Sequence, residues 1–205
     1  MLKVQILSNN YTQKPGLMAE HGLSLLVQVD DYRILFDTGQ SDTYAYNATT
    51  MGLDLTSVDA LVLSHGHYDH TGGVEDFVRL NKKAKLFIHP EAFVQRFNKG
   101  KKVQIGIPWP AAAFPERIVP VTGPLALAPG IFLTGQVPRV SEEKKTPFLK
   151  LVGDRLVDDY VLDEQLMLIR SKRGIYVFLG CCHMGIENAL SAVRKLFPQE
   201  KIAAV

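Results

Sequence analysis

Four potential metal ligands lie within six residues, between the first and last histidines of one short segment. They are His65, His67, Asp69 and His70. Imidazole nitrogens suit zinc, iron and other borderline ions, and a carboxylate oxygen suits a second, harder position. Gly66 permits the tight turn that would bring them together. A polar loop with incidental histidines is the alternative, but three of the chain's six histidines fall here, so the segment predicts a metal site.

The element that positions this cluster is the apolar run from Val58 to Leu63, directly before it. Such a run, bounded by polar residues, is typical of a strand buried on both faces. Ligands at the carboxyl end of such a strand commonly face a cleft. Three earlier strands, with a turn at Asp30-Asp31 before the last, predict an antiparallel opening: Lys3 to Ser8, Gly22 to Val29 and Arg33 to Phe36.

The rest of the chain predicts helices and strands around a proline-rich middle. Val103 to Pro147 holds eight of the eleven prolines, which predicts an irregular insertion of loops and short strands over the working face. The last segment, Lys201 to Val205, resembles a buried strand, so either another chain or element covers it or the sequence is a fragment. We expect helices at Ser41 to Met51 (capped by Ser41), Val74 to Asn81, Glu91 to Phe97 and Ile186 to Leu196, and strands at Lys85 to Ile88, Gln165 to Ile169 and Gly174 to Leu179.

Length and composition limit the class of protein. The chain has 205 residues, of which 46% are hydrophobic, and predicts a single domain over 1–205, a two-layer sheet sandwich with flanking helices. A net charge of +2 without a long basic run disfavours nucleic-acid binding. The uncharged stretch Ile118 to Pro138 carries four prolines and three glycines, so no membrane helix is expected. Adjacent Cys181 and Cys182 suggest a reducing, cytoplasmic setting.

The motif HGHYDH is similar to the His-x-His-x-Asp-His signature of the metallo-β-lactamase superfamily. The segment from Ile34 to Gly39 resembles the strand ending in Asp-Thr-Gly that precedes the signature there. The resemblance implies an α/β (α+β) fold, an αββα sandwich with the metal site at one edge of two sheets. It implies that His65 and His67 hold a first ion and that Asp69 and His70 hold a second. A histidine at 67, where the di-iron branch has glutamate, favours zinc or a similar divalent ion and disfavours oxygen chemistry.

A further ligand is expected from another strand end, because one loop cannot enclose an ion alone. Gly180-Cys181-Cys182-His183 follows the predicted strand Gly174 to Leu179, so His183 is the expected fourth imidazole. The superfamily places a bridging Asp, or in some lactamases a Cys, just after a glycine at this strand end, which makes Cys181 a candidate metal bridge. The alternatives are a helix-capping role for His183 and a small buried side chain for either cysteine.

Three segments resemble one branch of the superfamily, the dihydropterin-methyl-ribofuranosylaminobenzene phosphate synthase-like proteins. They are EHGLSLL from Glu20, TGQVPR from Thr134 and GCCHMGIEN from Gly180, and Asp163-Glu164-Gln165 fits the same branch. The resemblance makes His21 and Arg139 candidates to bind substrate. His21 could instead be a strand-end hydrogen bonder and Arg139 a solvated loop charge. His89, before Pro90, is expected to be structural.

The superfamily pattern also has a last histidine in a Gly-Gly-x-His context, which has no counterpart in this sequence. If the chain is complete, we expect one tightly held ion and a weak or empty second position. If it is a fragment, the missing tail would supply the ligand. One or two divalent ions per chain, most simply zinc, are therefore expected.

These observations predict a metal-dependent hydrolase that uses metal-activated water on an anionic, phosphorylated small molecule. Asp69 would orient that water or accept its proton. One alternative is the transferase that the branch resemblance implies, in which an aminobenzene ribofuranosyl phosphate attacks a pterin pyrophosphate. Another is a non-catalytic metal-binding or sensing protein. A small-molecule substrate, no nucleic-acid or membrane partner and a homo-oligomer are the expected associations.

Overall fold

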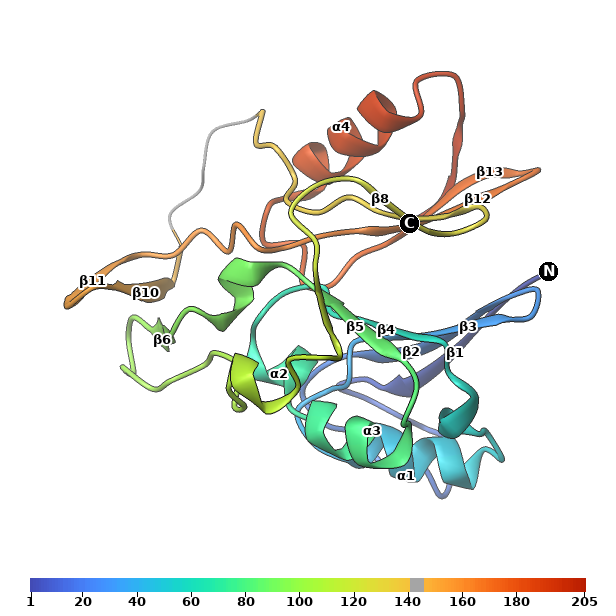
Figure 1. Ribbon diagram of the computed structural model, residues 1–205, viewed down its shortest axis with the longest axis horizontal. Coiled ribbons are helices and arrows are strands. Elements are labelled where there is room, and N and C mark those ends of the chain that lie inside the picture. The colour runs from blue at the N-terminus through green and yellow to red at the C-terminus, as the bar shows by residue number, and fades with distance from the viewer. Residues whose placement is uncertain (141–145) are drawn as a thin grey trace. The chain divides into compact units, whose positions relative to one another are not determined.

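The computed structural model describes residues 1–140 and 146–205, and the chain forms two compact units. Unit 1 comprises Met1–Ile88 and Ile107–Val119, and unit 2 comprises His89–Gly106 and Pro120–Val205. Figure 1 colours the chain from the N-terminal strands of unit 1 to the C-terminal strand of unit 2. No helix in the described part of the chain is both long enough and apolar enough to span a bilayer.

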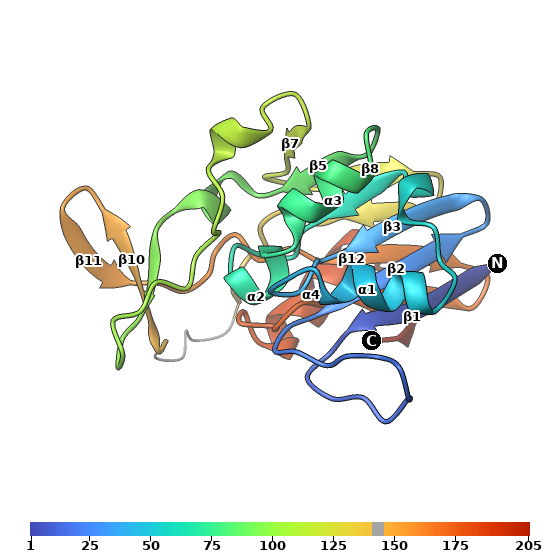
Figure 2. The same cartoon turned by 90° about the horizontal axis from the view of Figure 1, so that it is seen from below.

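Unit 1 is built on a sheet in the order β1-β2-β3-β4-β5-β7. The first three strands are antiparallel, and β3, β4 and β5 are mutually parallel, so these three end at the same edge of the sheet. Helices α1 and α3 lie along one face (Figures 1 and 2). The strands are β1 (Leu2–Ser8), β2 (Ser24–Val29), β3 (Tyr32–Phe36), β4 (Ala60–Val62), β5 (Lys85–Ile88) and β7 (Ile118–Pro120), and the helices are α1 (Thr43–Thr50), α2 (Tyr68–Thr71), α3 (Val74–Leu80) and a 3₁₀ turn, Leu55–Ser57.

The parallel strands form the core of unit 1. Ile34, Leu35 and Phe36 in β3 and the whole of β4 are buried, as expected for strands covered on both faces. The predicted strands before the histidine cluster are therefore confirmed, with bounds shifted by one or two residues. Helix α1 begins at Thr43, whose N–H donates to Ser41 Oγ at 3.2 Å.

Unit 2 contains a sheet in the order β14-β13-β12-β9-β8 and a smaller sheet, β11-β10-β6. Helix α4 packs on an apolar cluster that includes Leu168, Val177 and Ala189. The strands of unit 2 are β6 (Arg96–Asn98), β8 (Leu125–Ala128), β9 (Ile131–Leu133), β10 (Phe148–Val152), β11 (Arg155–Asp158), β12 (Met167–Ser171), β13 (Gly174–Phe178) and β14 (Ile202–Ala204). Its helices are α4 (Ile186–Leu196) and a 3₁₀ turn at Pro90–Phe93. A further 3₁₀ turn, Ala111–Ala113, belongs to unit 1.

Two sequence predictions for this part of the chain were wrong. Glu91 to Phe97 is not one helix, because the 3₁₀ turn ends at Phe93 and the chain extends into β6, which pairs with β10. The proline-rich middle does consist of loops and short strands, as expected, but it is not an insertion, since β9 pairs with β12 in the larger sheet.

The strand expected near the end of the sequence is present. It is β14, which pairs with β13, and its residues Ala203 and Ala204 are exposed in this chain.

A buried ion-pair cluster explains the extended backbone at β6. The guanidinium of Arg96 is fully buried and donates to Asp159 at 2.7 Å and to both carboxylate oxygens of Asp163 at 2.5 and 3.1 Å. It also donates to the carbonyls of Glu91 and Ala92. These contacts join the 3₁₀ turn to the segment that precedes β12.

Candidate metal centre

The predicted ligand segment follows β4 and leads into helix α2. His65, His67, Asp69 and His70 are all buried, with exposed fractions of 0%, 4%, 6% and 2%. The carbonyl of His67 accepts hydrogen bonds from the His70 N–H at 3.1 Å and from Thr71 Oγ at 2.9 Å, so α2 fixes the backbone of the segment. Polar side chains buried in this way are seldom incidental, because each must be hydrogen-bonded or bind a ligand.

His65 and His67 direct two ring nitrogens at each other. Nε2 of His65 lies 3.1 Å from Nδ1 of His67, and the two ring centroids are 4.7 Å apart. The other nitrogen of His65, Nδ1, lies 2.9 Å from Ser64 Oγ. That contact orients the ring of His65 and leaves Nε2 directed at His67.

Asp37 connects the strand β3 to this cluster. Its Oδ1 accepts the Ser64 N–H at 2.7 Å, and its Oδ2 lies 2.7 Å from both Ser64 Oγ and His70 Nδ1. Asp37 is fully buried, and its φ of 58° is one that Asp adopts more readily than most residues. Because Nδ1 of His70 faces Asp37, Nε2 is the nitrogen left to face a ligand.

The orienting role of Asp37 was not predicted, although Asp37 lies in the Asp-Thr-Gly segment that resembles the superfamily. A usable signal was present, since Asp37 follows one apolar strand and Ser64 follows another. Parallel pairing of β3 with β4 sets the two residues at the same sheet edge.

Asp69 has an imidazole on each side. Its Oδ2 lies 3.5 Å from Nε2 of His70 and 3.3 Å from Nε2 of His21. Asp69 is buried, whereas the His21 side chain is 61% exposed. The structure therefore brings His21 to the ligand segment, as a solvent-facing neighbour of its carboxylate.

The loop that carries His21 is fixed on both sides. Gly22 has a φ of +131°, and a Cβ there would lie 2.1 Å from the carbonyl oxygen of Asp69, so only glycine fits. On the other side, the Glu20 carboxylate accepts the N–H groups of Gln40 and Ser41 at 3.1 and 3.3 Å.

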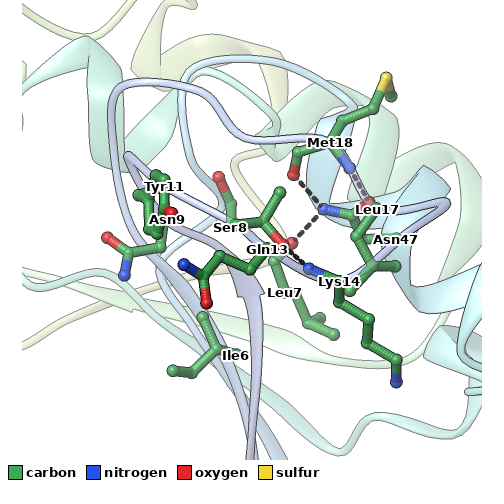
Figure 3. Close-up of a pocket in the computed structure, with 11 residues that line it drawn as sticks. Ile6, Leu7, Ser8, Asn9, Tyr11, Gln13, Lys14, Leu17, Met18 and Asn47 are labelled. Carbon is green, nitrogen blue, oxygen red and sulfur yellow. Dashed lines mark hydrogen bonds between the residues drawn. The ribbon is translucent and has the colours of Figure 1, made fainter.

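A cavity of about 340 Å³ lies between the start of this loop, the end of β1 and helix α1 (Figure 3). The side chain of Asn47 in α1 joins two segments that line the cavity. The amide nitrogen of Asn47 donates to the carbonyls of Leu7 at 2.7 Å and Met18 at 2.8 Å, and the amide oxygen accepts the Met18 N–H at 2.9 Å. Asn47 thereby anchors the loop two residues before Glu20.

The other predicted site residues belong to unit 2. His183 follows β13, and its ring meets the ring of Phe148 edge-on, with centroids 5.2 Å apart and an interplanar angle of 88°. Cys181 is exposed and Cys182 is half-buried. Burial, and then the nearby charge of Glu164, raise the pKa of the Cys182 thiol. Arg139 donates to the carbonyl of Tyr160.

The donor set of unit 1 fits a divalent ion. Two nitrogens bound to one tetrahedral zinc ion at about 2.0–2.1 Å lie about 3.3 Å from each other, close to the 3.1 Å between His65 Nε2 and His67 Nδ1. The ligand atoms of His65 lie within 4.8 Å of those of both His67 and His70. The far nitrogens are hydrogen-bonded as those of metal-binding histidines usually are: Nδ1 of His65 pairs with Ser64 Oγ, and Nδ1 of His70 pairs with the accepting carboxylate of Asp37.

Fold and ligand segment together define the class. The model of the metallo-beta-lactamase superfamily matches residues 18–156, and the chain belongs to that superfamily. This confirms the family and the fold predicted from the motif.

Individual proteins and solved structures are similar to this chain to different extents. Over 231 aligned residues the chain is 31% identical to 7,8-dihydropterin-6-methyl-4-(beta-D-ribofuranosyl)-aminobenzene-5'-phosphate synthase of Methanocaldococcus jannaschii, an alignment that covers 100% of this chain and 76% of the relative. A crystal structure described as a metal-dependent hydrolase of the beta-lactamase superfamily superposes with a TM-score of 0.83 at 29% identity, covering 98% of this chain and 74% of that one. An N-acyl homoserine lactone hydrolase shares the fold, with a TM-score of 0.54 at 13% identity and coverage of 89% and 79%.

Proposed function

We propose that the protein is a metal-dependent hydrolase acting on an anionic, phosphorylated small molecule. The observation that carries the proposal is the pair of facing nitrogens on His65 and His67, 3.1 Å apart and buried. Superfamily membership and the similarity to a structure described as a metal-dependent hydrolase support it.

In unit 1 the proposed ligands are those of the superfamily signature: His65 and His67 would hold one ion, and Asp69 and His70 would hold a second. In unit 2, His183 and Cys181 keep the roles that the resemblance implies, an imidazole ligand and a bridging thiolate. Zinc suits this set of imidazole, carboxylate and thiolate donors, at one or two ions per chain. When bound, a divalent ion supplies a Lewis acid and lowers the pKa of water to near neutral.

The chain's own residues have separate roles in this proposal. Asp69 orients the attacking water or accepts its proton, because its carboxylate lies at the centre of the ligand segment. Asp37 and Ser64 hold the rings of His70 and His65 through their far nitrogens. His21, exposed beside Asp69, is placed to contact the substrate.

An anionic substrate is proposed from charge and from the similar proteins. The M. jannaschii synthase is named for a product that is a phosphate ester, and Arg139 supplies a cation in a segment that resembles its branch. We further propose a cytoplasmic protein, a small molecule as its partner and a homo-oligomeric assembly.

A transferase is the second candidate function, and one observation favours it: 31% identity to the named synthase over the full chain. In that reaction an aromatic ribofuranosyl phosphate displaces pyrophosphate from the pterin substrate. The residues that hold the metal would be the same, but an organic nucleophile would replace water.

One experiment separates the two. Zinc-loaded protein is incubated with bis(4-nitrophenyl) phosphate and, separately, with the pterin pyrophosphate and the aminobenzene ribofuranosyl phosphate. Hydrolysis of the diester that falls at least about 100-fold in His67→Ala supports the hydrolase. Pyrophosphate release only with the pterin pair supports the transferase. No turnover of either substrate by the zinc-loaded protein contradicts both and leaves a metal-binding protein without catalysis.

A further inference from the structure

We propose that Tyr68 is a specificity-determining residue, which selects substrates that carry a planar aromatic ring next to the anionic group. The inference rests on the proposed function, in which His21 contacts an anionic substrate beside Asp69. It uses residues of unit 1 only, and it assigns a role to a position of the HGHYDH motif that supplies no proposed ligand.

The first observation is an exposed aromatic side chain within a segment whose proposed ligands are buried. Tyr68 is 36% exposed, whereas its neighbours His67 and Asp69 are buried. The first turn of α2 therefore buries the ligands and leaves the phenol ring open to solvent. Ligand sites are lined largely by apolar and aromatic side chains, and an exposed ring at such a place is available to pack against a ligand.

The second observation is that this ring has an aromatic neighbour, His21. The centroids of the two rings are 6.5 Å apart, within the range over which aromatic rings interact, and their planes are tilted by 52°. The His21 side chain is exposed as well, and its Nε2 lies 3.3 Å from Asp69 Oδ2. Two exposed rings thus lie beside one buried carboxylate of the ligand segment.

Both rings are carried by backbone that hydrogen bonds already fix. Directly after His21, the Gly22 N–H donates to Asn10 Oδ1 at 3.0 Å. The Tyr68 carbonyl accepts the Gly72 N–H at 2.8 Å. Because tyrosine has few side-chain torsions and its backbone is held, a ligand that packs against it loses little binding free energy to ordering. The two rings are therefore suited to hold a ligand in one orientation.

The order of these groups separates the two ends of a substrate. A phosphoryl group that contacts the His21 imidazole lies one ester oxygen away from the organic group that it carries. That organic group would lie against the neighbouring ring of Tyr68. A planar ring can stack on the phenol ring or meet it edge-on, whereas a puckered aliphatic ring cannot present a π face. The two rings therefore favour an aryl ester over an alkyl one.

Substitution of Tyr68 should change this preference and little else. The interaction between two aromatic rings, beyond the burial of their area, corresponds to roughly 2- to 12-fold in affinity. Tyr68→Leu keeps an apolar side chain but removes the ring, so the preference for an aromatic ligand should fall by that factor. Tyr68→Phe keeps the ring and should retain the preference. Because Tyr68 is an exposed residue and no proposed ligand, stability in urea and metal content should stay at wild-type values.

The test measures binding of phenylphosphonate and of cyclohexylphosphonate to the zinc-loaded full chain by isothermal titration. The two compounds share the anionic group and have rings of similar size, but only phenyl is planar. The ratio of their dissociation constants in each variant is compared with the ratio in the wild type, which cancels the difference in hydration between the compounds. Tyr46→Leu, which removes an exposed tyrosine from α1, is the matched control and should leave the ratio unchanged.

An unchanged ratio in Tyr68→Leu overturns the inference, as does an equal change in Tyr46→Leu. A loss of metal content in Tyr68→Leu also overturns it, since the side chain would then act through the metal centre. Tyr68→Ala should lower the ratio too, and it keeps the test decisive where Tyr68→Leu folds poorly.

The inference and the proposed function fail in different measurements. If the zinc-loaded wild type does not hydrolyse bis(4-nitrophenyl) phosphate but the phosphonate ratio still falls in Tyr68→Leu, the hydrolase is contradicted and the role of Tyr68 is supported. If the diester is hydrolysed and the ratio does not change, only the role of Tyr68 fails. If the wild type binds neither phosphonate, the inference is overturned.

Discussion

The carboxylate of Asp37 lies 2.7 Å from Nδ1 of His70, although 33 positions separate the two residues. Both are buried, and Asp37 also holds Ser64, whose hydroxyl lies against the ring of His65. One side chain at the end of β3 thus orients two histidines of the ligand segment. The Nε2 atoms that these two rings leave for a ligand are therefore arranged by the fold of unit 1.

Substituting Asp37 should weaken the fold and the metal site together. Asp37→Asn can keep the left-handed backbone, but its amide group must oppose one of the N–H or O–H donors that now point at the carboxylate. We expect a loss of about 1–3 kcal/mol in the free energy of unfolding and a roughly 10- to 100-fold loss of zinc affinity. Urea unfolding and chelator competition measure the two. Asp42→Asn, which makes the same change at an exposed position, is the control. If the Asp37→Asn protein bound zinc with wild-type affinity, Asp37 would not orient the ligands.

Removing the His21 side chain should lower the kcat/KM for the substrate and leave the metal content unchanged. Because it is 61% exposed, His21→Ala should change stability by no more than about 0.5 kcal/mol. The value of kcat/KM for a phosphodiester should fall about 10- to 100-fold, the worth of one hydrogen bond to a charged group. Elemental analysis of the purified variant supplies the check: a drop in metal content would mean that His21 is a ligand instead of a substrate contact.

Breaking the ion-pair cluster of unit 2 should be strongly destabilising. Arg96→Met leaves the carboxylates of Asp159 and Asp163 buried without their cation, which costs about 3–5 kcal/mol. Arg155→Met, at an exposed position on β11, should stay near the wild-type value. Thermal and urea unfolding compare the two variants, and equal stability would show that the cluster is dispensable.

Stability should also depend on pH through His89. Burial lowers the pKa of this histidine in the folded protein, outweighing the nearby Asp163 and Glu91 carboxylates, while Arg96 lowers it further. Its Nδ1 accepts the Glu91 N–H at 3.2 Å, which requires the unprotonated nitrogen. The folded state therefore favours neutral His89, so its contribution is present above the unfolded pKa of about 6.5 and is lost as the pH falls below it.

The measurement is the urea midpoint of the metal-free protein at pH 7.5 and 5.5. Wild type should lose more stability between the two than His89→Gln, whose side chain does not titrate. An identical loss in both proteins would assign the pH dependence to other groups.

How far the sequence predicts this structure depends on how local each interaction is. Lys85–Ile88 and Ile186–Leu196 form where their own residues favour a strand and a helix, and the observed bounds match the prediction. The helix predicted over Glu91 to Phe97 failed because Arg96 pairs with carboxylates more than 60 positions away. No local pattern contains that information.

In the candidate site, too, the sequence predicts what depends on local spacing and misses what depends on contacts between distant segments. Spacing alone identified His65, His67, Asp69 and His70, and the structure gathers them in one buried segment. The orienting role of Asp37 follows from the parallel pairing of β3 with β4, and the approach of His21 to Asp69 depends on a close contact at Gly22. Both depend on backbone proximity between distant segments, which periodicity does not encode.

The most direct test of the account is the metal content of the purified protein by elemental analysis. The wild type should carry about one to two divalent ions per chain, and a His65→Ala, His67→Ala double variant should fall toward none. Circular dichroism matching that of the wild type should accompany the loss. A correctly folded double variant with undiminished metal content would contradict the assignment of these two histidines as the core of the site.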